Sequence, residues 1–176
     1  DGGVVLSAPG VLARYNDAGE QQWIIDVGGE FVETALGVAP NGDILWATND
    51  WDGGTNDFDR YDGDGNLIGP VDVPFVSSFA YPWGIEWIGD DMVLGCFDEN
   101  DDGWDAPTLL RVGPNGEELL RKSNPNVGAQ SFAINAMGTV LFSGPLVAAE
   151  DGGVLGTLTP SSGGIQGATG MGDDFL

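Results

Sequence analysis

A short turn that recurs along the chain constrains its fold most strongly. The segments RYNDAGE, RYDGDGN and RVGPNGE begin at Arg14, Arg60 and Arg111, at intervals of 46 and 51 residues. Each segment joins two apolar, strand-like stretches, and its glycine supplies the positive φ that the tight turn of a β-hairpin requires. A fourth, degenerate copy is expected one interval later, around Thr157. The repeat therefore predicts a series of similar hairpins.

A second kind of hairpin lies between these turns. The segments LGVAPNGDILWAT, GIEWIGDDMVLGC and FAINAMGTVLFSG place Gly42, Gly89 and Gly138 at their bends, spaced 47 and 49 residues apart. Two hairpins in a period of roughly 46 to 50 residues give four strands per repeat, which is typical of β-propeller blades. We expect the more apolar hairpin to form the inner pair of strands in each blade and the Arg-bearing hairpin the outer pair.

The predicted fold class is all-β, because thirty glycines and ten prolines interrupt the chain and no long helical periodicity is present. We expect one β-propeller domain over residues 1–176, with about four blades of four antiparallel strands. The expected blade segments are approximately 1–27, 28–76, 77–124 and 125–170. The strands add up to slightly fewer than four full repeats, which leaves three alternatives. The chain is a fragment of a larger propeller, or another chain supplies the missing strand, or MGDDFL closes an incomplete ring. An open edge would favour self-association, because it exposes unpaired backbone groups.

The charge and the composition exclude several function classes. Twenty-eight acidic side chains against five basic ones give a formal net charge of -23, which disfavours nucleic acids and anionic membranes as partners and favours cations. The absence of histidine excludes Ser-His-Asp and Cys-His catalysis and histidine zinc sites. Cys96, the single cysteine, lies in an apolar run and is expected in the core. We assign no catalytic residue. An acidic, lysine-poor, turn-rich composition is typical of an extracellular or cell-surface bacterial protein, and no apolar run is long enough to span a membrane.

The segment FDENDDGWDAP, Phe97 to Pro107, carries the clearest metal-binding pattern. Hard oxygen ligands stand at alternate positions of a calcium loop, with Gly103 where such a loop turns sharply. Position 12 is Leu109 in place of the usual glutamate, so a nearer carboxylate would have to complete the site. The predicted calcium ligands are Asp98, Asn100, Asp102 and Asp105. The alternative is a solvated acidic connection between two hairpins.

The same connection in the preceding repeat, NDWDGGTNDFD, is also acidic and contains Trp51, as the later one contains Trp104. A tryptophan beside Asp and Asn in a polar loop has the chemistry of a carbohydrate-binding surface, and the alternative is that both rings cover a blade edge. The Asp-rich turn that begins at Asp62 is predicted to be structural, because its sister turns keep the glycine and lack the carboxylates. The recurring arginines are expected to form structural salt bridges with neighbouring acids.

The alternation of Arg-Tyr turns with PNGDILWAT resembles the extracellular bacterial propeller repeats grouped as NHL, SMP-30-like or PQQ-like. The segment GEQQWIID around Trp23 is similar to the Gly-x-x-x-Trp of the PQQ-like group. The resemblance implies a propeller and, for enzymes of SMP-30 type, one divalent cation held at the ring centre by Glu, Asn and Asp side chains. Those ligands are not assigned to individual residues of this chain.

We expect a non-enzymatic, secreted or cell-surface scaffold or binding module that calcium stabilises and that binds a protein or carbohydrate ligand. The alternative is a metal-dependent hydrolase or lactonase of SMP-30 type, with a divalent cation in the central channel. Apolar side chains filling the propeller axis would favour the binding module. Three or more oxygen ligands on the axis would favour the enzyme.

Overall fold

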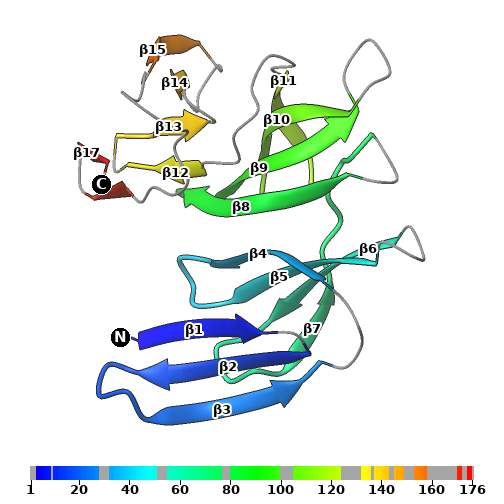
Figure 1. Cartoon of the computed structure of the whole chain (residues 1–176), viewed down its shortest axis with the longest axis vertical. Helices are drawn as coiled ribbons and strands as arrows, with labels where there is room; N and C mark the ends of the chain where they lie inside the picture. The colour runs from blue at the N-terminus through cyan, green and yellow to red at the C-terminus, as the bar shows by residue number, and fades with distance from the viewer. Residues whose placement is uncertain are drawn as a thin grey trace. The chain divides into compact units, whose positions relative to one another are not determined.

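Short antiparallel strands make up the regular structure of the chain, and the described part contains no helix (Figure 1). The computed structural model describes residues 3–8, 10–27, 32–50, 55–76, 80–99, 105–123, 132–135, 137–142, 145–148, 153–157, 170–171 and 174–175. A search of these ranges for a membrane-spanning helix finds no candidate.

The chain divides into two compact units, Asp1–Asp72 and Val73–Leu176. In the first unit, a three-stranded sheet contains β1 (Gly3–Ala8), β2 (Val11–Asn16) and β3 (Gln21–Asp26). A four-stranded sheet follows, with β4 (Val32–Val38), β5 (Ile44–Asp50), β6 (Thr55–Tyr61) and β7 (Leu67–Pro70). In both sheets the strands lie side by side in sequence order, as successive hairpins require.

The second unit repeats this arrangement. One four-stranded sheet contains β8 (Tyr81–Ile88), β9 (Asp91–Glu99), β10 (Asp105–Val112) and β11 (Glu118–Ser123). The next contains β12 (Phe132–Ile134), β13 (Thr139–Phe142), β14 (Pro145–Ala148) and β15 (Val154–Thr157). A two-stranded sheet pairs β16 (Gly170–Met171) with β17 (Asp174–Phe175). The expectation of one domain over residues 1–176 stays a prediction.

One five-residue turn closes both kinds of hairpin. In the β4–β5 turn, the Ala39 amide donates to the Asp43 carbonyl and the Gly42 amide donates to the Ala39 carbonyl, each at 2.8 Å, and Gly42 has a φ of 90°. This pattern corresponds to a type I turn followed by a glycine in the left-handed region. The same two hydrogen bonds recur in the turns that begin at Asn16, Asp62, Gly113 and Asn135. The β8–β9 hairpin differs, since Ile88 pairs with Asp91 across only two residues.

The predicted position of the fourth Arg-type turn is wrong. Thr157 is the last residue of β15 and not part of a turn. In the β12–β15 sheet Leu146 pairs with Leu141, and the corresponding pair in the first unit is Arg60 with Leu45. Leu146 is therefore the counterpart of the recurring arginines. The strands of this sheet have only three or four residues, and the shorter strands explain why the repeat interval shrinks here.

In each unit, one sheet packs face to face on the next. In the first unit, a core cluster joins the two sheets through the buried side chains of Leu12, Ile44, Trp46 and Tyr61. In the second unit, Val93 and Leu109 of the β8–β11 sheet meet Val140 of the β12–β15 sheet. Because side chains alternate along a strand, each sheet places one apolar face in such an interface.

Phe132 of β12 packs directly on the backbone of two glycines of the neighbouring sheet. Gly84 of β8 and Gly95 of β9 are paired opposite each other. A Cβ atom at Gly84 would lie 2.5 Å from Phe132 Cδ1, and a Cβ atom at Gly95 would lie 2.8 Å from Cδ2. The two missing side chains therefore create the space that the phenyl ring fills.

We expect Gly84→Ala to lower the free energy of unfolding by about 1–3 kcal/mol, because the added methyl group overpacks the contact with Phe132. Chemical denaturation of the purified chain measures the loss. Gly156→Ala is the matched control, since a Cβ atom at Gly156 meets nothing within 4 Å. Equal stability of the two variants would contradict the close contact.

Candidate functional site

Two of the recurring arginines form the predicted salt bridges. Arg60 Nε donates to Asp43 Oδ2 at 2.7 Å, and Arg111 donates to Asp91 Oδ2 from Nε at 2.9 Å and from Nη2 at 2.6 Å. Asp43 directly precedes β5 and Asp91 begins β9, so each pair links the third strand of a sheet to the start of the second. These contacts link the second and third strands of each sheet.

Arg14 has no carboxylate at the equivalent place. In the β4–β7 and β8–β11 sheets, the aspartate lies two residues before the residue that pairs with the arginine, as Asp43 and Asp91 do. In the β1–β3 sheet Arg14 pairs with Val5, so the equivalent position is Gly3. Gly3 has a φ of 146°, and a Cβ atom there would lie 2.6 Å from the Tyr15 carbonyl oxygen. The backbone therefore excludes an aspartate at this position.

Arg14 contacts the neighbouring sheet of its unit. Its Nη1 donates to the Gly63 carbonyl at 2.7 Å, and Trp23 Nε1 donates to the same oxygen at 3.0 Å. Gly63 lies in the β6–β7 turn, so these two bonds fasten that turn to the β1–β3 sheet. The salt bridge predicted for Arg14 is thus replaced by a hydrogen bond to the backbone.

The Asp62 turn has the structural role predicted for it. Asp62 Oδ1 accepts hydrogen bonds from the amides of Asp64 at 2.9 Å and Asn66 at 2.8 Å, and the Asn66 side chain donates to Oδ2 at 2.9 Å. The Asn66 side chain, followed by backbone amides, lowers the pKa of Asp62 below its usual value. Asn16 and Asn135 accept the same two backbone bonds with a neutral amide, so the turn does not depend on a carboxylate.

Asp98, the first predicted calcium ligand, is fully buried in β9. Its Oδ1 accepts a hydrogen bond from the Val76 amide at 3.0 Å, and its Oδ2 forms an ion pair with Arg121 Nη1. A buried carboxylate requires such a partner, because desolvation of an unpaired charge is costly. Asp98 thereby holds the segment that precedes β8 against the sheet.

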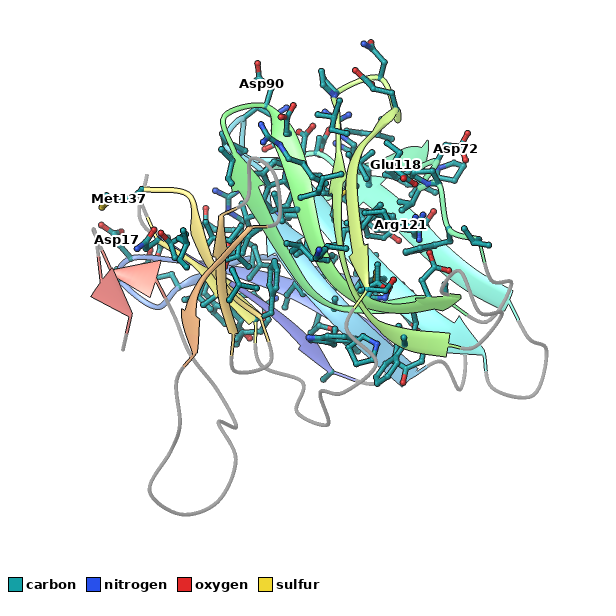
Figure 2. All side chains as sticks on the ribbon, turned by 90° about the horizontal axis from the view of Figure 1, so that it is seen from above. Asp17, Asp72, Asp90, Glu118, Arg121 and Met137 are labelled. Carbon is teal, nitrogen blue, oxygen red and sulfur yellow. The ribbon has the colours of Figure 1, made fainter. Side chains whose placement is uncertain are left out.

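Arg121 completes this arrangement from β11. It donates to Glu118 Oε2 from Nε at 3.0 Å and from Nη2 at 2.8 Å, and to the Pro74 carbonyl from Nη2 at 2.5 Å; Figure 2 shows Arg121 and Glu118 close together. Burial by itself would lower the pKa of Arg121, but the carboxylates of Glu118 and Asp98 outweigh it and raise the pKa. The sequence did not reveal this pair, since 23 residues separate Arg121 from Asp98 and no local spacing connects them.

The calcium site stays a prediction. Asp105 begins β10 and pairs with Glu99, whereas Asn100 and Asp102 lie outside the described residues. For Asp98 to bind a cation, that cation would have to compete with the Arg121 guanidinium. Among the residues that the structure describes, no three His, Cys, Asp or Glu side chains are grouped as a metal site would require.

The acidic connections occupy the expected place in their sheets. β5 ends at Asp50 and β6 begins at Thr55, while β9 ends at Glu99 and β10 begins at Asp105, so each connection joins the second strand to the third. The equivalent connections are shorter in the other two sheets, where only residues 9–10 and 143–144 intervene. Trp51 and Trp104 belong to the longer connections and lie outside the described residues, so their role as a ligand surface stays a prediction.

Cys96 is a core residue, as predicted. The thiol is fully buried, and Sγ donates to the Thr108 carbonyl at 3.3 Å. Burial, followed by the nearby Asp98 carboxylate, raises the pKa of the thiol far above its usual value. Such a thiol stays protonated near neutral pH and does not act as a nucleophile or metal ligand.

The structure resembles solved β-propellers. The WD40 β-propeller domain of Doa1 matches with a TM-score of 0.72 and 13% identity over 99% of this chain and 56% of that one. The Dos1 propeller matches with a TM-score of 0.60 and 9% identity over 95% of this chain and 47% of that one. A protein of unknown function from Bacteroides caccae matches with a TM-score of 0.57 and 15% identity over 93% and 60% of the two chains. No protein-family model matches the sequence, and no curated protein sequence matches it.

These likenesses confirm the predicted fold class. The chain has a β-propeller fold in which antiparallel strands are arranged as blades, and it spans about half the length of the solved structures that it matches. At such low identity the likeness concerns the fold alone. The grouping with NHL, SMP-30-like or PQQ-like repeats stays a prediction.

We expect Asp98→Asn to lower the free energy of unfolding by about 3 kcal/mol, because it removes one partner of a buried ion pair. Chemical denaturation measures the loss. Asp91→Asn serves as the comparison, since both side chains of its pair are about one-fifth exposed and solvent already screens their attraction. A loss for Asp98→Asn no larger than for Asp91→Asn would contradict the anchoring role.

We expect Asp62→Ala to lower the melting temperature and Asp62→Asn to preserve it at neutral pH, because only asparagine retains the oxygen that accepts the two turn amides. The pKa of Asp62 is lower in the folded chain than in the unfolded chain, so its contribution to stability is present above the unfolded pKa and disappears as the pH falls through the folded pKa. Thermal melts from neutral to acidic pH should therefore show a larger loss in the parent chain than in the asparagine variant, which retains the other acidic side chains. Identical pH profiles would refute the electrostatic part of this contribution.

Proposed function

We propose that this propeller is a non-enzymatic scaffold or binding module of the cell exterior that binds cationic groups and is stabilised by calcium. The proposal rests on the observation that four of the five basic side chains are already engaged in contacts within their own units. Of the five basic residues, Arg14 is bonded to a backbone carbonyl, and Arg60, Arg111 and Arg121 are paired with carboxylates inside their own units.

Most of the acidic charge therefore has no basic residue to balance it. Four arginines and Lys122 stand against 28 acidic side chains, and three of the arginines are already committed to particular carboxylates. An uncompensated negative surface raises the local concentration of cations and of basic ligand groups. This supports a cation, or a protein ligand with basic side chains, as the partner.

Three aspartates and the single thiol are engaged in structural contacts, which supports a binding role for this proposal. Asp43, Asp91 and Asp98 are occupied by arginines, and the Cys96 thiol is buried. General acid–base catalysis needs a group that can reach the substrate and exchange a proton with it. The contacts of these four groups instead stabilise the sheets.

The longer acidic connections are the proposed ligand-binding surface. They lengthen the same strand-to-strand link in two of the sheets, and each contains one tryptophan, Trp51 or Trp104. An aromatic ring beside carboxylates can stack on a sugar or pack on the aliphatic part of a basic side chain. We therefore include a carbohydrate as well as a basic protein segment among the ligands to be tested.

A thermal melt in excess EDTA and then in millimolar calcium tests the cation requirement. We expect calcium to raise the melting temperature, since a ligand that binds only the folded chain stabilises it by about 2.7 kcal/mol at a hundred times its Kd. Asp102→Ala should abolish most of this rise. Asp17→Ala, which likewise removes one acidic side chain, here an exposed one of the β2–β3 turn, should retain it.

Sodium chloride at matched ionic strength is the control for general screening. Equal calcium responses of the two variants would show that calcium acts by screening and not at the loop, and the absence of any response would overturn calcium stabilisation. Hydrolysis of a lactone by the chain in the presence of a divalent cation would overturn the non-enzymatic assignment in favour of the SMP-30-type alternative.

A further inference from the structure

Two turns of the chain contain the dipeptide Asn-Gly. The sequence PNG occupies residues 40–42 in the β4–β5 turn and residues 114–116 in the β10–β11 turn, and no other asparagine of the chain precedes a glycine. The Gly42 and Gly116 amides close their turns in the same way, by donating to the carbonyl three residues earlier at 2.8 and 3.0 Å. Their φ angles are 90° and 85°. The two turns therefore form a matched pair with the same backbone.

The Asn41 side chain is held at both ends by the residue that follows the glycine. Its Nδ2 donates to Asp43 Oδ2 at 2.9 Å, and its Oδ1 accepts a hydrogen bond from the Asp43 amide at 3.1 Å. Asp43 is itself fixed, because Arg60 Nε donates to the same Oδ2 at 2.7 Å. The side-chain amide of Asn41 thus belongs to a network of hydrogen bonds that extends to β6.

A glutamate replaces this aspartate in the β10–β11 turn. Glu117 Oε2 accepts a hydrogen bond from the backbone amide of Asn115 at 3.0 Å, and not from its side chain. The longer side chain folds back over the turn, where a Cβ atom at Gly113 would lie 2.5 Å from Glu117 Oε1. Within the part of the chain that the structure describes, no hydrogen bond of the Asn115 side chain is found. The same dipeptide is therefore restrained in one turn and unrestrained in the other.

An asparagine followed by glycine can lose ammonia without an enzyme. The amide nitrogen of the glycine gives its proton to hydroxide and attacks the side-chain carbonyl carbon of the asparagine. A C–N bond forms, the old C–N bond breaks, and the leaving nitrogen takes a proton from water and departs as ammonia, which leaves a succinimide ring. Water then adds to either ring carbonyl and opens it to aspartate or isoaspartate. Glycine permits the attack because no Cβ atom shields its nitrogen.

We propose that Asn115 is a site of spontaneous deamidation and that Asn41 is protected from it. In both turns, the attack requires the glycine amide to leave its hydrogen bond to the backbone. Asn41 must in addition break two side-chain hydrogen bonds, whereas no such bond restrains Asn115 in the described part of the chain. Succinimide formation is therefore concentrated at Asn115.

Deamidation at this site changes the β10–β11 hairpin. Either product adds a negative charge next to Glu117, and isoaspartate also lengthens the backbone by one carbon atom within the turn. The two hydrogen bonds that close the turn, from the Gly113 amide to the Glu117 carbonyl and from the Gly116 amide to the Gly113 carbonyl, then lose their geometry. Because a turn sets the register of the strands that it joins, chains with isoaspartate should melt at a lower temperature.

Tryptic mapping of the 176-residue chain after storage in warm, mildly alkaline buffer tests the proposal. Trypsin releases Asn115 in the peptide Val112–Arg121, and fragment masses report the exchange of NH for oxygen at each asparagine. In the folded chain we expect Asn115 to be lost about tenfold faster than Asn41, the factor that the net stabilisation by two hydrogen bonds gives. In urea the two rates should be equal, since neither side chain is then held.

Glu117→Asp is the most direct variant, because it gives the β10–β11 turn the PNGD sequence of the protected turn. It should slow the loss of Asn115 toward that of Asn41. Asn115→Gln is the control, since the longer side chain closes a ring far less readily and the Val112–Arg121 peptide should stay unmodified. Equal rates in the folded chain, the same difference between the rates in urea, or an unchanged rate in Glu117→Asp would each overturn the proposal.

Discussion

The rest of the structure depends on a five-residue turn with a left-handed glycine at its fourth position. Each copy fixes where one strand ends and the next begins, and a shift of one residue would exchange the two faces of a sheet. The glycines at the fourth position are Gly19, Gly42, Gly65, Gly116 and Gly138, all with positive φ. Because one turn geometry closes both kinds of hairpin, the apolar residues of successive sheets point to equivalent sides and the sheets can stack.

The arginine contacts follow from this registration. The pairing of the second and third strands brings the arginine within reach of an aspartate that lies before or at the start of the second strand, and this holds also in the β8–β11 sheet, where the preceding turn is the shorter one. Where the residue at one of the two positions changes, the pair is lost. Gly3 leaves no room for a carboxylate and Arg14 bonds to a neighbouring turn, while the β12–β15 sheet has Thr139 and Leu146 at the two positions and thus neither charge.

Local features of the fold could be predicted from the sequence, and distant contacts could not. Turn glycines, hairpins and the four-strand repeat are encoded within a dozen residues, so the propeller and two of the salt bridges were predictable. The pairing of Asp98 with Arg121 and the packing of Phe132 on two glycines join residues far apart in sequence, which no spacing rule detects. For the candidate site, Asp98 matched a calcium pattern, yet the pattern could not reveal the guanidinium that the sheet brings to it.

The lone thiol offers a way to observe part of the chain separately. Cys96 is the single cysteine, it is completely buried, and it belongs to the second compact unit. An alkylating reagent can reach it only when the structure around it opens, so the rate of labelling under native conditions reports the opening of that unit. Tryptophan fluorescence, by contrast, averages over both units, because Trp23 and Trp46 lie in the first and Trp83 and Trp87 in the second. Together the two signals would show whether the units unfold as one cooperative body or in succession.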